Sequence, residues 1–458
     1  MLKKFVETLE RFFSKIFMPR GNPLYFLGAL AVFFMWLLLA TGIYLFVFYK
    51  IETPYLSVRY LTEQWYLGGI IRSVHRYAAD GLIFCTVLHL TYVLIKGRHF
   101  KHGWLPWVSG VVLFLPILIT GVIGYWLVWD KRGEMIGELT AKLFNLLPFS
   151  GESPSFFFIL LFIHIAIPVL LFILTWIHVM KLQRPVINPT KRVSVAVIVI
   201  LILMSVLKPA TILNPANIAE NISILKLDWF YLFPYPLLNI APASHVWMFC
   251  FIMISIITTL PWLINVKKSN NLKSNVAYLY KKGPILKRYF FGTVSLLIPV
   301  FIVLLLSDKE YVFSDTAASS LKISIKYLGK RVVDCDEAFI INKEGERYRE
   351  VLAQTGKANM KLKKIGDCSR ERHPVVLEVY IDDKMFMGKS CKPAGWKKDG
   401  ASFIYENLQL SPGRHLITVK IRDSIDSEPY ILREMLDFKE GEAKIISFDK
   451  KLKLPYVR

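Results

Sequence analysis

Two pairs of histidines constrain this chain more than any other feature. His75 and His89 lie fourteen positions apart in one apolar segment, and His164 and His178 lie fourteen positions apart in another. Fourteen residues make nearly four helical turns, so both members of a pair share one helix face, about 21 Å apart. A lone histidine in an apolar helix is more often a core residue, but ionisable residues in membrane spans are costly and usually functional. The repeated spacing predicts imidazole ligands for two stacked haems.

The order of the segments predicts how the ligands pair. The histidines lie in the second and fourth hydrophobic spans, and alternate spans of a membrane protein run in the same direction. We therefore expect His75 to share one haem with His164, and His89 to share the other with His178.

Glycines in the first and third spans repeat this spacing. Gly28 and Gly42 lie fourteen positions apart, as do Gly110 and Gly124. A haem between helices needs close backbone approach, which a residue without a Cβ allows. Small-residue helix packing is the alternative, but it does not predict a spacing equal to that of the histidines. We expect these glycines to face the haems.

The composition excludes an ordinary soluble protein, because 54% of the 458 residues are hydrophobic. The predicted fold is an all-α transmembrane bundle of seven spans with a four-helix di-haem core, followed by a β-sandwich-like soluble domain. The expected spans are 25–48, 70–95, 105–129, 156–180, 193–212, 243–266 and 288–307. The expected domains are an amphipathic segment (1–20), the four-helix di-haem domain (21–182), a three-helix domain (183–308) and the soluble domain (309–458).

Lysine and arginine concentrate in the N-terminal segment and in the loops after the second, fourth and sixth spans. This asymmetry predicts a multi-pass protein of a bacterial-type inner membrane, with a cytoplasmic N-terminus and a periplasmic soluble domain. Anionic lipids account for the net charge of +22 without a nucleic-acid partner. Segment 1–20 lies either on the membrane surface or against the bundle, and the sequence leaves both open.

Short motifs in the helical part match a known family. They are Arg72-x-x-His75, Gly124-Tyr125, His164-x-x-x-Pro168, Asn188-Pro189, Asn214-Pro215-Ala216-Asn217 and Leu227-Asp228-Trp229-Phe230. With these motifs, residues 20–307 resemble cytochrome b of the bc1 and b6f complexes. The three later spans resemble a b6 plus subunit IV layout, fused here into one chain.

The resemblance implies a quinol-oxidising subunit with two non-covalent haem b groups. Quinol would be oxidised at the outer face, sending one electron to a Rieske-type iron–sulfur or c-type cytochrome subunit. The other electron would pass through the outer haem (His75, His164) and the inner haem (His89, His178) to a quinone. Family members are homodimers within a larger complex. Arg72 would pair with a haem propionate, and snorkelling to lipid head groups is the alternative.

The outer quinol site implied by the resemblance contains Tyr125, Asp228 and Trp229. Asp228 stands where the family has glutamate, and we expect it to accept the quinol proton; an ordinary loop acid is the alternative. Leu227 and Phe230 replace the family's proline and tyrosine. The inner site stays unassigned, although polar residues lie near that face, and the family's inner arginine is missing. The inner candidates are His99, His102 and Arg184, with Lys96 or Arg98 for the missing arginine.

The soluble domain has the alternation of β-strands at 321–327, 375–381, 417–421 and 443–448, with a turn at 411–413. We expect an immunoglobulin-like sandwich that docks other periplasmic subunits. Cys335, Cys368 and Cys391 allow one disulfide there, and no C-x-x-C-H motif for covalent haem occurs in the chain.

Two other functions compete with quinol oxidation. The altered Leu227–Phe230 motif is consistent with a quinone-reducing subunit that receives electrons from a periplasmic donor. A transporter or scaffold could instead use the histidines for packing or proton relay. Haem content distinguishes a transporter or scaffold from the two redox functions. Inhibitor sensitivity at the outer site distinguishes quinol oxidation from quinone reduction.

Overall fold

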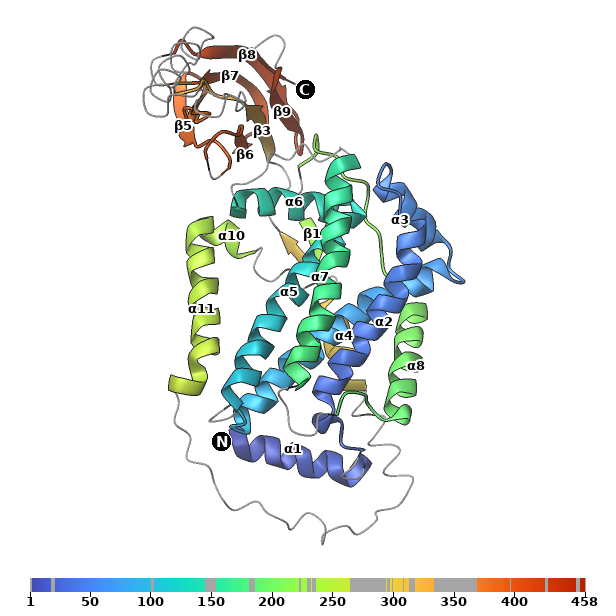
Figure 1. Cartoon of the computed structure of the whole chain (residues 1–458). Coiled ribbons are helices and arrows are strands. Elements are labelled where there is room, and N and C mark those ends of the chain that lie inside the picture. Colours follow the sequence, from blue (N-terminus) through green and yellow to red (C-terminus); the bar gives the residue numbers. More distant parts are fainter. Residues whose placement is uncertain are drawn as a thin grey trace, which may run out of the picture. The chain divides into compact units, whose positions relative to one another are not determined.

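The computed structural model in Figure 1 describes most of the chain. The described residues are 2–17, 21–99, 103–144, 154–180, 186–221, 224–228, 232, 236–263, 294, 297–298, 300–307, 309–312, 318–332, 369–395, 397–424, 427–449 and 454–457. They divide into a helical unit (1–139, 152–217 and 224–313) and a β unit (140–151, 218–223 and 314–458).

The helical unit is built around long apolar helices that run side by side (Figure 1). Its elements are α1 (Leu2–Phe17), η2 (Pro23–Tyr25), α2 (Leu27–Phe48), α3 (Pro54–Glu63), α4 (Gly68–Ile95), α5 (Trp104–Val128), α6 (Lys131–Phe144), α7 (Pro154–Met180), α8 (Lys191–Leu207), α10 (Leu237–Ile240) and α11 (Ala243–Leu263). Two short strands, β1 (Ile224–Leu227) and β2 (Lys309–Val312), pair antiparallel within the same unit.

Five described helices are long and apolar enough to cross a membrane: α2, α4, α5, α7 and residues 244–263 of α11. These correspond to five of the seven predicted spans. The fifth predicted span forms α8, whose 17 residues are at the lower limit of the roughly 17–25 that a span needs. The seventh lies largely outside the described residues, although residues 300–306 are helical.

Helix α1 contacts the bundle, which is one of the two positions that the sequence left open for this segment. Val6 lies in one apolar cluster with Leu27 and Tyr92. The Glu10 carboxylate accepts hydrogen bonds from the Tyr92 hydroxyl and the Lys96 ammonium, each at 2.6 Å. The amphipathic segment is therefore held by both its apolar face and a half-buried ion pair.

Helix α6 lies across the opposite end of the bundle from α1 (Figure 1). Asp130 caps α6, because its Oδ1 accepts hydrogen bonds from the backbone N–H groups of Arg132 and Gly133 at 3.1 and 3.0 Å. Its Oδ2 accepts the N–H of Leu213 at 3.0 Å. The cap thus also holds the chain that leaves α8.

The β unit contains two four-stranded sheets around one apolar core. Their orders are β10-β9-β3-β6 and β5-β4-β7-β8, and the only parallel pair within these two described sheets is β3 with β9. The strands are β3 (Ser319–Tyr327), β4 (Val375–Ile381), β5 (Lys384–Cys391), β6 (Ser402–Leu410), β7 (Gly413–Arg422), β8 (Tyr430–Phe438), β9 (Ala443–Asp449) and β10 (Leu454–Val457). The four strands predicted from alternation are confirmed as β3, β4, β7 and β9.

Local sequence explains the hairpin between β4 and β5. Val375, Leu377 and Val379 are fully buried while their neighbours are half-buried, as expected for one covered sheet face. Asp382 and Asp383 both have positive φ, 51° and 60°, which is the conformation of a two-residue type I′ turn.

Cys391 is a buried free thiol, as is Cys85, and Cys250 is also unpaired. Of the predicted disulfide pairings, only Cys335 with Cys368 is compatible with this, and both of those residues lie outside the described part of the chain.

The turn at Asp382 makes a prediction about pH. Its Oδ2 lies 2.8 Å from Nδ1 of His415, and this hydrogen bond raises the pKa of His415 above its usual 6.5. The same bond lowers the pKa of Asp382 below its usual 3.8. A raised histidine pKa stabilises the fold below pH 6.5 and loses this effect as pH rises through the raised value. A lowered aspartate pKa stabilises above pH 3.8 and loses this effect as pH falls.

We therefore expect His415→Gln to weaken the β7 region most between about pH 4 and 6.5. Hydrogen exchange of β7, corrected for intrinsic rates, measures this effect. Arg433→Gln, which removes an exposed pair with Asp383, is the control. An equal effect of His415→Gln at pH 6 and pH 9 would contradict the assignment.

Candidate functional site

Each of the four histidine rings lies against one of the four glycines. A Cβ built on the glycine would meet Cε1 of the histidine at 3.1–3.4 Å in every case. The pairs are Gly42 with His75 (3.4 Å), Gly124 with His164 (3.1 Å), Gly28 with His89 (3.2 Å) and Gly110 with His178 (3.4 Å). A larger residue at any of these positions would press on the ring, so the glycines leave room for the imidazoles.

The rings themselves come together in two pairs. The His75 ring is close enough to interact electrostatically with His164, and the His89 ring with His178. Because the first and second histidines of α4 meet the first and second of α7 in the same order, the two helices run parallel. The structure thus brings together the pairs that the sequence predicted.

Three of the histidines have a partner at Nδ1. Thr41 Oγ1 lies 2.8 Å from Nδ1 of His75, and Ser109 Oγ lies 2.8 Å from Nδ1 of His178. His164 Nδ1 lies 3.1 Å from the carbonyl oxygen of Thr120. Such partners orient an imidazole and leave Nε2 for a metal. Thr41 and Ser109 directly precede Gly42 and Gly110, a signal that the sequence reading missed.

These residues fit a haem better than a metal held by side chains alone. Within the described ranges, no three His, Cys, Asp or Glu side chains gather to hold an ion. A haem iron needs only two axial ligands from the protein. Close glycine backbone and oriented imidazoles are what a flat macrocycle between helices requires.

A buried charge cluster lies next to the histidine site, and two of its members directly follow His75 on α4 and Gly124 on α5. The fully buried Asp228 accepts hydrogen bonds from Arg76 Nη2 at 2.7 and 2.9 Å and from Arg132 Nη1 at 3.4 Å. The Tyr125 hydroxyl also donates to it. Arg76 follows His75 and Tyr125 follows Gly124, so Asp228 is joined to the helices at the level of the His75 and His164 rings.

The resemblance placed Tyr125 and Asp228 in one site, but the sequence did not connect Arg76 or Arg132 with them. Arg132 lies 5.5 Å from the centre of the Tyr125 ring, and Arg76 lies 5.8 Å from that of Tyr77. Arg76 and Arg132 offered no spacing signal, since they come from separate helices that only the fold brings together.

Arg72 binds main chain in this structure. Its guanidinium donates to the carbonyl oxygens of Ala210 and Thr211, at 2.7 and 3.2 Å. Ser73 and Tyr77 hold the same segment, because Ser73 Oγ accepts the Ala210 N–H at 2.9 Å and the Tyr77 hydroxyl donates to the Lys208 carbonyl oxygen at 2.6 Å. This end of α4 therefore anchors the chain after α8.

Several other candidates fall outside the site or outside the described chain. Trp229, His102 and Arg184 lie outside the described residues. His99 is buried beside Trp107, with ring centres 5.2 Å apart. Lys96 is paired with Glu10, and Arg98 lies 5.4 Å from the Tyr92 ring centre.

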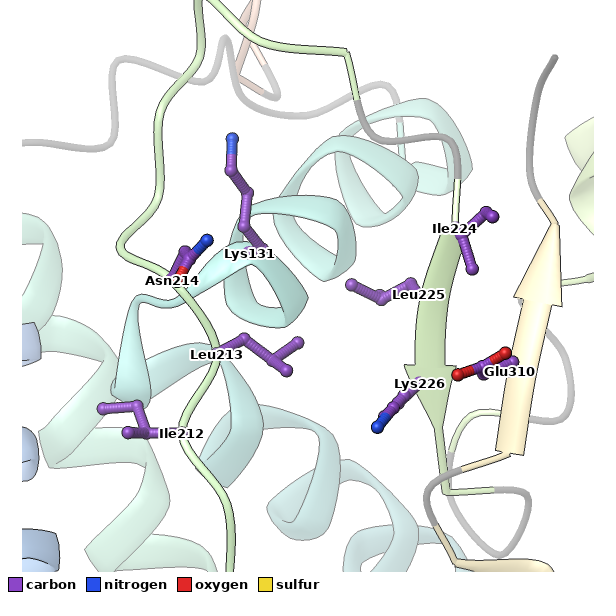
Figure 2. A pocket seen from close by; sticks show the side chains of 8 residues that line it. All are labelled: Lys131, Ile212, Leu213, Asn214, Ile224, Leu225, Lys226 and Glu310. Atoms are coloured by element: carbon purple, nitrogen blue, oxygen red, sulfur yellow. The ribbon is translucent and has the colours of Figure 1, made fainter. Parts of the chain in front are cut away.

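A cavity of about 360 Å³ borders β1, the strand that directly precedes Asp228 (Figure 2). Its lining is mixed, with apolar side chains beside two lysines and one glutamate. The lining residues are Lys131, Ile212, Leu213, Asn214, Ile224, Leu225, Lys226 and Glu310. Lys131 also donates to the Asn217 carbonyl at 3.0 Å.

Comparison with known proteins finds similarity over the N-terminal part of the chain. The family model described as cytochrome b/b6/petB matches residues 13–155. Cytochrome b6 of Mastigocladus laminosus is 31% identical over 140 residues, which are 30% of this chain and 65% of that protein. Cytochrome b6 of Euglena gracilis is 30% identical over 141 residues, which are 30% of this chain and 66% of that protein.

The chain thus spans about 65% of the length of the Mastigocladus relative. A chain of a solved hyperthermophilic respiratory Complex III gives a TM-score of 0.45 at 15% identity, covering 62% of this chain and 82% of that one. The family match includes His75, His89 and the four glycines, while His164 and His178 lie beyond it. Over residues 13–155, this chain is similar to the cytochrome b/b6 family.

Proposed function

We propose that this chain is the di-haem cytochrome b subunit of a quinol oxidoreductase of the bc type. The observation that carries the proposal is the one-to-one facing of four glycines and four histidine rings at two levels of one helix bundle. A transporter or scaffold would not require the two registers to coincide.

In this proposal His75 and His164 hold one haem b, and His89 and His178 hold the other. Each haem would supply one-electron redox chemistry. Thr41, Ser109 and the Thr120 carbonyl orient their imidazoles through Nδ1. The two levels are about 21 Å apart along a helix, which spans much of a hydrocarbon core of about 30 Å.

Quinol would be oxidised at the end of the bundle that carries α6, which we take as the outer, periplasmic face. Asp228 and Tyr125 would be its polar groups, since both are joined to residues adjacent to the His75 level. Arg76 and Arg132 hold Asp228 in place through hydrogen bonds to its carboxylate. A proton from quinol would reach this carboxylate through the Tyr125 hydroxyl, which already donates to it. A Rieske-type or c-type cytochrome subunit would accept one of the two electrons that quinol releases. This chain would work as a homodimer.

Loss of one ligand should remove one haem and leave the other. We expect His75→Ala and His164→Ala to lose the same haem, and His89→Ala and His178→Ala to lose the second. Pyridine haemochrome content would fall from two haems to one in each variant, and redox titration would lose the same potential within a pair. His245→Ala, at the exposed start of α11, is the control. Different potentials lost within one pair would refute the pairing.

The glycines can be tested by size. Gly124→Val should displace the His164 ring, because a Cβ already comes within 3.1 Å of it. We expect about half of the haem to be lost. Gly21→Ala, whose Cβ would have its nearest neighbour at 3.7 Å, should keep both haems. Full haem content in Gly124→Val with unchanged potentials would count against the facing role of the glycines.

Quinol-dependent haem reduction should depend more on the negative charge at position 228 than on the length of that side chain. Asp228→Asn leaves two buried guanidinium groups without their counter-charge, which is strongly unfavourable, and removes the proton acceptor. We expect quinol-dependent haem reduction to fall about a hundredfold. Asp228→Glu keeps the charge and should retain more activity than Asp228→Asn. Rates are compared at equal haem content, with Asp383→Asn in the β unit as control. Equal rates in wild type and Asp228→Asn would exclude this role.

A further inference from the structure

A short segment of the loop between α8 and Asp228 belongs to the β unit. Residues 218–223 lie between the Asn214–Asn217 motif and β1, yet they group with the sheets. Asn221 N–H donates to the Gly441 carbonyl at 3.0 Å, and Ala443 N–H donates to the Ala219 carbonyl at 2.9 Å. Residues 219–221, which we call the strap, therefore form an isolated antiparallel β-bridge with residues at the start of β9.

Side chains reinforce this pairing. The Asn221 amide donates to the carbonyl of Ala318, the residue before β3, at 3.1 Å. The Lys322 ammonium reaches the Glu220 carbonyl at 3.4 Å, and Lys322 is only 1% exposed. The contacts involve the beginnings of both β3 and β9, so the strap is held to the centre of one sheet.

The loop has separate supports on either side of the strap. Before it, Asn217 N–H donates to the fully buried Glu134 carboxylate at 2.9 Å, and Lys131 N–H donates to the Asn214 carbonyl at 2.9 Å. After it, β1 pairs with β2 along its whole length. Asp228 follows β1 directly, seven positions after Asn221.

A loop loses conformational freedom when some of its residues are held by hydrogen bonds to a sheet. Binding to the sheet removes conformational freedom from residues 219–221, a few residues before Asp228, and so shortens the free part of the loop that leads to this carboxylate. No partner protein is needed for this effect, because the strap and the sheet belong to one chain.

We propose that the β unit orders the loop that leads to Asp228, acting through the β-bridge and the hydrogen bonds that the strap makes with the sheet. Its effect on quinol rests on the function proposed above. Asn221 is the main positioning residue, since its backbone and side chain both bind the sheet. The docking role that the sequence analysis expected for this domain is a different function and is not required by these contacts.

The strap can be released and locked in the full chain. Asn221→Pro removes both the N–H and the amide that bind the sheet. Glu220 and Glu442 form an antiparallel bridge whose hydrogen bonds are at the flanking residues. Such directly opposed residues have Cα atoms about 4.5 Å apart, within the range that a disulfide spans. Glu220→Cys with Glu442→Cys therefore gives a strap that oxidation locks and reduction frees.

Two readouts are taken on the purified, haem-loaded protein. Hydrogen exchange of residues 224–228 reports the loop, and the KM for a short-chain quinol reports the site. We expect Asn221→Pro to speed exchange at 224–228 by about tenfold and to raise KM several-fold at unchanged haem content. The oxidised cysteine pair, added to Asn221→Pro, should return both values towards wild type, and reduction should reverse this. Arg433→Ala, in the other sheet, should change neither.

Unchanged hydrogen exchange at residues 224–228 in Asn221→Pro would show that the strap does not order the loop. Faster exchange that oxidation of the cysteine pair does not reverse would show the same. Faster exchange with unchanged KM would overturn the positioning role. If Asn221→Pro does not fold, the paired cysteines without it still decide, because oxidised and reduced forms must then differ in exchange and KM. If the wild type oxidises no quinol, the proposed function fails, while the exchange measurements still decide whether the strap holds the loop.

Discussion

The close approach of glycine backbone to histidine rings is the constraint on which the helical unit depends. Burying four imidazoles in apolar helices is unfavourable unless each ring has room and a partner. Gly28, Gly42, Gly110 and Gly124 supply the room, and hydroxyl or carbonyl oxygens supply partners for three of the rings. Helices α2, α4, α5 and α7 are thereby fixed in register with one another, because a shift of one residue would put a side chain against a ring.

Buried charge organises the two ends of the bundle. At one end Glu10 joins α1 to α4 through Tyr92 and Lys96. At the other, Asp228 joins α4, α5 and α6 through Arg76, Tyr125 and Arg132. Buried ion pairs add little net stability, yet removing one partner is costly. Such clusters therefore favour one arrangement of helices over others, and the second cluster does so beside the histidine level where we propose quinol chemistry.

The loop between α8 and Asp228 connects these features to the β unit. It is bound in turn to the end of α4, to the α6 cap, to the sheet of β3 and β9, and to β2. The extra domain is therefore built into the same loop that carries Asp228. Its contribution to the proposed chemistry is a matter of loop order, which the strap variants measure.

Periodic features could be predicted from the sequence because they depend only on local geometry. The apolar helices, the fourteen-residue registers and the alternating β-strands all follow from 3.6 or 2 residues per repeat. Residues without a period could not be placed. Arg76, Arg132 and Asp228 are 56 and 96 positions apart along the chain, and the strap pairs with residues more than 200 positions away. Contacts of that separation are set by how the helices and sheets pack, so only the tertiary structure decided which charges meet and which loop the β unit holds.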